Sequence, residues 1–149
     1  MANNTKVLDV AKFFLEKENF MTHKKLQKLV YYAYAWYMVR NNQPGERLMR
    51  KLFEGRIEAW VHGPVCRELY DRYSSLNKYV AQALSTSEKD LLEKIWLIYG
   101  KYTGAELENL THKEEPWKTA RGKLAGLVRS SKVIKDRDIY EYYHAKLNS

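Results

Sequence analysis

The sequence predicts a mainly α-helical protein, a single-domain bundle of about six helices around a central helix at about residues 22–40. Two observations predict this class. Apolar residues recur at spacings of three and four along most of the chain, whereas only one stretch, near residues 52–61, alternates with period two. The 149 residues are 45% hydrophobic and 13% aromatic, so we expect residues 1–149 to form one domain around one core, with one short extended or β-hairpin element.

Most of the expected helices have a recognisable start. The first should begin at Asn4 or Thr5 and run to about Asn19. Thr22 is a good N-cap for the second, which is apolar around almost its whole circumference up to Arg40 and should therefore be surrounded by protein. The later helices should start at Ser85, which has Glu88 at capping-box spacing, and at Thr103, Pro116 and Asp136.

The segment "WVHGPV" (60–65) follows the alternating stretch. Gly63 permits a turn that a Cβ would obstruct, and Pro64 suits the first turn of a helix. We therefore expect a hinge here, with a helix from Pro64 to about Tyr73. In this interpretation the segment is architecture, and the structural residues of this motif and of the later Pro-Trp helix start are Trp60, Gly63, Pro64, Val65 and Pro116.

The sequence favours a reducing compartment and no membrane partner. Cys66 is the only cysteine, so the chain cannot form an intrachain disulfide. Acidic residues fall where a signal peptide would need an uncharged core. The longest uncharged apolar run, residues 29–39, has 11 residues, whereas a membrane-spanning helix needs about 20. We expect a soluble, cytoplasmic protein.

The net charge of +8 is concentrated in one segment. Residues 116–135 hold six basic groups and no acidic one. Such a field favours an acidic partner, either nucleic acid or an acidic protein surface, and composition alone does not choose between them. A solvated basic face without any partner is a third interpretation.

Three reactive interpretations of the same region stay open from sequence. His62 and Cys66 lie four apart, a spacing found in zinc sites, but Gly63 and Pro64 interrupt the helix that would bring them together. Cys66 in the first turn of a helix could be a nucleophile with a distant histidine as base. His62 and His112 could act as the acid and base of a ribonuclease. None has a supporting motif, so we expect no enzyme, no metal and no cofactor.

Three blocks of the chain together resemble one known family. They are "LQKLVYYAYAWYMV" (26–39), "IEAWVHGPVCRELYDRY" (57–73) and "ELENLTHKEEPWKTARG" (106–122). Their order and content are similar to the Panacea-domain family, the SocA-like antitoxins also called phage-associated proteins. The stretch "ERLMRKLFEG" (46–55) looks longer than the usual link between the first two blocks.

The resemblance implies a helical, non-catalytic domain that neutralises a protein toxin encoded beside it by direct binding. One member of the family acts as an adaptor that delivers its toxin to a bacterial ATP-dependent protease, so the resemblance leaves open whether neutralisation is by blocking or by delivery. Members serve unrelated toxins, and toxin identity does not carry over. Aromatic and arginine side chains dominate interface energetics. We therefore expect a partner-facing surface made of His62, Arg67, Tyr70, Tyr73, His112, Trp117 and Arg121.

Two other functional classes remain beside the antitoxin interpretation. A basic nucleic-acid-binding regulator is the second choice, because residues 116–135 can contact phosphates. A ribonuclease that depends on His62 and His112 is the third.

Overall fold

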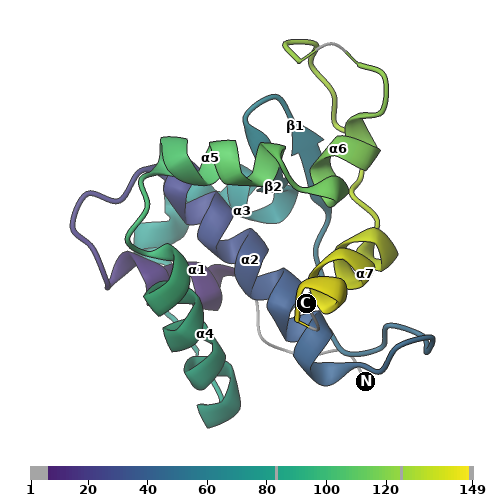
Figure 1. The fold of residues 1–149 in the computed structure, drawn as a ribbon. Helices are drawn as coiled ribbons and strands as arrows, with labels where there is room; N and C mark the ends of the chain where they lie inside the picture. The colour runs from purple at the N-terminus through teal and green to yellow at the C-terminus, as the bar shows by residue number, and fades with distance from the viewer. Residues whose placement is uncertain (1–6, 83, 125, 148–149) are drawn as a thin grey trace.

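One long helix runs through the middle of the molecule (Figure 1). In this computed structural model, which describes residues 7–82, 84–124 and 126–147, the fold is mainly α-helical with one small antiparallel hairpin. The elements are α1 (Val7–Leu15), α2 (His23–Asn41), β1 (Ile57–Trp60), β2 (Gly63–Cys66), α3 (Arg67–Arg72), the 3-10 turn η1 (Tyr73–Lys78), α4 (Thr86–Tyr99), α5 (Gly104–His112), α6 (Glu115–Arg121) and α7 (Asp136–Leu147).

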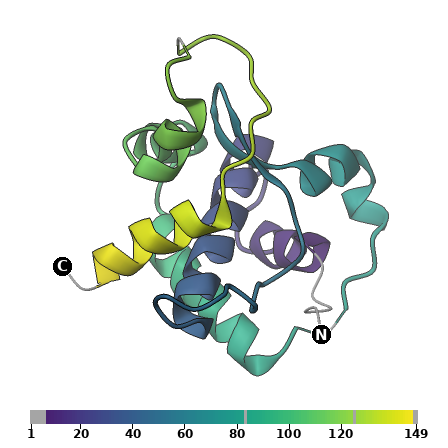
Figure 2. The same ribbon diagram turned by 90° about the vertical axis from the view of Figure 1, so that its right-hand side faces the viewer.

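The expected central helix is confirmed. The helix α2 packs against α1, α4, α5, α7 and β2, and 13 of its 19 residues are buried. The other elements are arranged around α2, as Figures 1 and 2 show, so most of its side chains meet protein. None of the described helices is long and apolar enough to cross a bilayer.

Capping side chains define several helix starts as the sequence predicts. The Thr22 hydroxyl accepts a hydrogen bond from the Lys25 amide at 3.1 Å, and Ser85 and Glu88 form a complete capping box. Thr103 also caps its helix, in a second capping box with Glu106. These bonds satisfy amides that the first helical turn leaves without partners, so they fix where each helix begins.

The first helix is shorter than expected. It ends at Leu15 rather than near Asn19, and the Lys17 amide donates to Phe14 in a tighter turn. The residues from Glu16 to Asn19 include no apolar side chain, so nothing would hold another helical turn against the core. The proposed caps at Asn4 and Thr5 lie outside the described residues.

The hairpin lies later in the chain than predicted, and the helix after it starts later too. Leu52 and Phe53 are both buried, which breaks the period-two pattern, and strand pairing begins only at Ile57. Pro64 lies within β2 rather than at a helix start, and α3 begins at Arg67. The predicted hinge is therefore a hairpin, with Val61 and His62 as its two-residue turn.

Strand register explains why a proline is tolerated there. The Arg67 amide donates to the Arg56 carbonyl, so hydrogen-bonded pairs alternate along the hairpin with non-bonded ones. Pro64 pairs with Ala59 at a non-bonded position, and its missing N–H costs the ladder nothing. From sequence alone Gly63-Pro64 predicts a helix start, because Pro suits the first turn of a helix as well as a non-bonded strand position.

A buried glutamate joins α2, α6 and α7. The hydroxyls of Tyr32 and Tyr143 donate to Glu114 Oε1 at 2.8 and 2.7 Å, and the Tyr31 hydroxyl lies 3.1 Å from that of Tyr143. Burial raises the pKa of Glu114, and the two tyrosine hydrogen bonds offset this only in part.

We predict that Glu114 makes the protein less stable as pH rises. Because its folded-state pKa is raised, the native state keeps a proton that the unfolded state loses above its normal pKa of 4.5. Its stabilising contribution is full below that pH and is lost as pH rises through the folded-state pKa. Urea unfolding of the wild type and Glu114→Gln across this window should show a decline in the wild type that the variant lacks. Parallel pH profiles would contradict this account.

Candidate partner-binding face

The outer edge of β2 is held by side chains of α2 in place of a further strand. The Cys66 amide donates to Gln27 Oε1 at 2.9 Å, and Gln27 Nε2 donates back to the Cys66 carbonyl at 3.4 Å. Lys28 Nζ donates to the Pro64 carbonyl at 3.2 Å. These residues occupy the non-bonded positions of the hairpin, whose backbone groups point away from β1. Three buried backbone groups are thereby satisfied by two side chains.

The other strand is held by the segment that precedes α7. The Ala59 amide donates to the Lys132 carbonyl, and the Ile134 amide donates to the Ile57 carbonyl, both at 2.8 Å. This pairing includes an antiparallel bridge between Glu58 and Val133. Part of the basic segment 116–135 is therefore bound to the edge of β1 by backbone hydrogen bonds around an isolated β-bridge, an attachment that the sequence does not predict.

The hairpin turn packs closely on the helices behind it. Gly63 has a φ of +110°, and a Cβ there would lie 2.8 Å from Lys28 Cε and 2.9 Å from Thr111 Oγ1. Trp117 Nε1 donates to the Trp60 carbonyl at 2.8 Å, and the His112 ring stacks on Trp117 with centroids 3.9 Å apart. Only glycine fits this conformation and this distance, as the sequence predicts.

Arg121 ties the hairpin to the loop after α6. Its guanidinium donates to the carbonyls of Ala59 at 3.1 Å, Val128 at 2.6 Å and Gly126 at 3.3 Å, and it also lies over the Trp117 ring. The residue is only 3% exposed. The expectation that the Arg121 side chain faces a partner is therefore wrong, because the side chain is buried and hydrogen-bonded to three backbone carbonyls.

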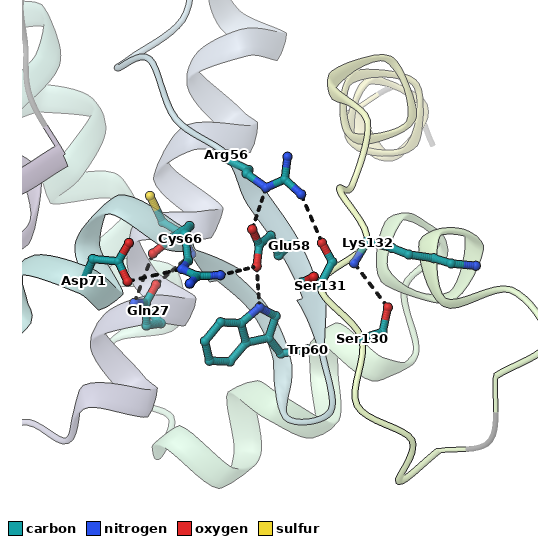
Figure 3. A network of polar contacts seen from close by, with 10 residues as sticks. Gln27, Arg56, Glu58, Trp60, Cys66, Asp71, Ser130, Ser131 and Lys132 are labelled. Atoms are coloured by element: carbon teal, nitrogen blue, oxygen red, sulfur yellow. Dashed lines mark hydrogen bonds and ion pairs between the residues drawn. The ribbon is translucent and has the colours of Figure 1, made fainter.

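The opposite face of the hairpin is built around Glu58, a buried carboxylate (Figure 3). Trp60 Nε1 donates to it at 2.7 Å, Arg56 Nε at 2.5 Å, and Arg67 lies 3.5 Å away. Burial acts to raise the pKa of Glu58, but these hydrogen bonds and the two arginine charges outweigh it and lower the pKa. Arg67 also binds Asp71 at 3.1 Å.

Aromatic rings cover the side of this face next to α3. The Tyr70 and Trp60 rings meet edge to face with their centroids 4.7 Å apart. The Tyr73 ring stacks on the His23 ring with centroids 3.7 Å apart. Burial and the nearby charge of Lys28 lower the pKa of His23. At the turn, His62 Nδ1 lies 2.9 Å from a carboxylate oxygen of Glu108, which also binds Lys24.

The seven residues expected on one partner-facing surface therefore divide into two groups. His62, Arg67 and Tyr70 are exposed on the outer face, with Tyr73 partly buried beside them. His112 and Trp117 are partly buried behind the hairpin, and Arg121 is fully buried there. The front group is available for contact, and the rear group fixes the position of the front group. Of the structural residues, Val65 and Pro116 are buried and Trp60 is half-buried.

The polar residues that organise this site were missed from the sequence. Gln27, Lys28, Glu58 and Glu108 are charged or amide residues that looked like ordinary surface positions. Lys28 is 2% exposed, and burial lowers its pKa to about 7. The one available signal is that Gln27 and Lys28 lie directly beside the uncharged apolar run of residues 29–39.

The reactive interpretations find no support in this geometry. Cys66 is buried, which raises its pKa to about 11 and disfavours the thiolate that a nucleophile needs. Nε2 of His112 is buried and without a hydrogen-bond partner among the described residues, while the ring donates to the Val61 carbonyl. Burial lowers the pKa of His112. The described ranges contain no cluster of three or more side chains that could hold a metal ion.

Comparison with known proteins identifies the family. Residues 26–118 match the family described as antitoxin SocA-like, Panacea domain. The chain belongs to this SocA-like antitoxin family. No curated protein and no solved structure matches it. The Panacea-domain match covers the hairpin and the groups of α2, α5 and Trp117 that hold it, and it ends before Arg121.

We predict that Gly63→Ala destabilises the protein by about 1–3 kcal/mol, because it places a Cβ in a strained backbone conformation and against Lys28 and Thr111. Gly45→Ala is the matched control, because Gly45 also has a positive φ, of +78°, but nothing within 4 Å of the added Cβ. Urea unfolding should show the larger loss at Gly63. Equal losses would mean that the close approach to α2 and α5 does not matter.

We also predict that Arg121→Ala costs about 2–4 kcal/mol, since it leaves buried carbonyls without their charged donor. The loop after α6 should open at the same time, so trypsin should cleave faster after Lys123 and Arg129. Lys118→Ala, an exposed change in the same helix, should alter neither. Unchanged stability and unchanged cleavage in Arg121→Ala would show that the guanidinium does not hold the loop.

Proposed function

We propose that this protein is an antitoxin that neutralises a cognate protein toxin by binding it directly. The observation that carries the proposal is the family match over residues 26–118, which contains the whole hairpin. The toxin would be the product of the adjacent gene, as the family resemblance implies. No catalytic step is assigned to this chain.

The outer face of the hairpin has the composition of a protein-binding surface. It exposes Tyr70 and Arg67, residue types enriched at interfaces, and the apolar Leu127 beside them. Because hydrogen bonds hold the hairpin backbone from behind, this backbone loses little freedom on binding. We propose that His62, Arg67, Tyr70 and Tyr73 contact the toxin, and that His112, Trp117 and Arg121 act through the position of the hairpin.

Two routes of neutralisation fit this role. Binding can block the toxin, or the protein can deliver it to an ATP-dependent protease. The routes differ in a measurable quantity: on coexpression, toxin abundance is unchanged if it is blocked and falls if it is delivered. A strain that lacks the protease would restore abundance only in the second case.

A nucleic-acid-binding regulator is the second candidate. It is favoured by five exposed basic residues of the segment 116–135, namely Lys118, Lys123, Arg129, Lys132 and Lys135. Affinity that falls steeply with log salt would support it. Its weakness is that Arg121 is buried and the 132–134 part is paired with β1, so the segment is less free than its sequence suggests.

We predict that the neighbouring open reading frame arrests growth when it is induced alone in the source organism or a close relative. Coinduction of this protein should restore growth, and the two proteins should copurify. The Gly63→Ala variant should rescue growth less well than the wild type if the hairpin must be held in place. A harmless neighbour, or rescue without copurification, would contradict direct neutralisation of that gene product.

A further inference from the structure

The outer face of the hairpin carries a groove of about 700 Å³. It is lined by residues of the hairpin and its turn, by Tyr70 of α3 and by the segment 127–131: Trp60, Val61, His62, Val65, Tyr70, Leu127, Arg129, Ser130 and Ser131. Five of these nine residues are exposed, so the groove is open and suits a length of polypeptide better than an enclosed small ligand.

The carboxylates around this groove already have cationic partners. Glu58 binds Arg56 and lies near Arg67, Asp71 binds Arg67, and Glu108 binds Lys24 and pairs with His62. Arg129 is exposed on the groove wall and has no ion-pair partner among the residues that the structure describes. An incoming acidic group therefore meets an unpaired guanidinium without displacing an existing pair.

Leu127 is the apolar feature of the same wall. It is 86% exposed, and the neighbouring Val128 is 44% exposed, although Arg121 holds the Val128 carbonyl in place. Exposed apolar side chains on a fixed backbone, beside an arginine and a tyrosine, are the composition of an interface centre.

We propose that this groove receives an extended segment of the toxin in which an acidic side chain lies beside a large apolar one. The acidic side chain pairs with Arg129, and the apolar side chain packs between Leu127 and Tyr70. The identity of the partner as a toxin rests on the proposed function, whereas the chemistry of the segment rests on the groove.

The aromatic rings favour a protein segment over a nucleic acid. Binding of single strands depends on ring faces on which bases stack. Here the Trp60 and Tyr70 rings meet edge to face with centroids 4.7 Å apart, and Arg67 Cζ lies 6.0 Å from the Trp60 ring centroid. Its indole is further fixed by the hydrogen bond to Glu58. The Trp60 ring is therefore already packed rather than open for stacking. The exposed apolar side chains Leu127 and Val128 cannot bind a phosphate group.

The test is selection of a phage-displayed library of short random peptides on the immobilised full chain. Peptides with Asp or Glu next to Leu, Ile, Phe or Trp should be enriched. Their affinity, measured by fluorescence anisotropy, should fall about tenfold or more in Arg129→Glu and in Leu127→Asp. Enrichment of peptides without acidic residues, or unchanged affinity in both variants, would overturn the proposal.

Matched controls come from α4, which lies at the far end of the molecule from this segment in both ribbon views (Figures 1 and 2). Lys94→Glu and Leu97→Asp make the same chemical changes at exposed positions and should leave peptide affinity unchanged. Equal urea midpoints for all four variants establish that lost binding is not lost folding. Tighter binding of an RNA oligonucleotide than of any peptide, lost in Arg129→Glu and in high salt, would assign the groove to nucleic acid instead.

The same variants separate this proposal from the proposed function. If the wild type neutralises the neighbouring gene product and Arg129→Glu with Leu127→Asp neutralises it equally, the function stands and the groove proposal falls. If acidic, apolar peptides bind the wild type but not the variants, while no toxin is neutralised, the groove proposal stands and the function falls.

Discussion

The hydrogen bonds between Gln27 and the backbone of Cys66 are the interaction on which the candidate partner-binding face depends. A two-stranded hairpin of this length is not stable by itself in water. Here the buried edge of β2 meets a helix, which has no free backbone groups to offer along its middle. One amide side chain supplies both a donor and an acceptor, and the hairpin is joined to the central helix as though to another strand.

The remaining contacts extend this attachment around the hairpin. Trp117 and Arg121 bind the carbonyls of Trp60 and Ala59 from behind, and the segment 132–134 pairs with β1. On the outer side, Glu58 pairs with Arg56 and Arg67 and accepts a hydrogen bond from Trp60. Glu58 and Arg121 are the buried charged groups of this set, so removal of either would leave buried polar groups without a hydrogen-bond partner. A fixed outer face is the result, and fixed side chains bind at a lower entropic cost.

Local signals predicted the helices well because capping is a local interaction. Thr22, Ser85 and Thr103 lie three residues before the amides that they cap. The apolar residues around α2 likewise predict its central position from its own sequence. The predicted extended element at 52–61 contains β1, but the sequence predicts a helix from Pro64 where the structure has β2, since Pro and Gly suit a strand end and a helix start equally well. Only pairing across the turn decides between them, and that pairing depends on Gln27, almost 40 residues earlier.

The candidate site was predictable in part. The aromatic and basic residues of the block at 57–73 pointed to the outer face, but sequence gave no way to divide front residues from rear ones. Arg121 looks like a surface residue in a basic segment, and its burial comes from carbonyls that only the fold brings together. The groove likewise joins α3 to a segment more than 50 residues later, a proximity that no local pattern encodes.

Amide hydrogen exchange of this protein, alone and in complex with the neighbouring gene product, tests the central claim most directly. The account predicts that the partner increases protection in two separate stretches, the hairpin turn with α3 and the segment 127–131, while α4 is unaffected. Protection confined to α1 and α4, with the hairpin unchanged, would contradict the account and move the binding face to the other end of the molecule.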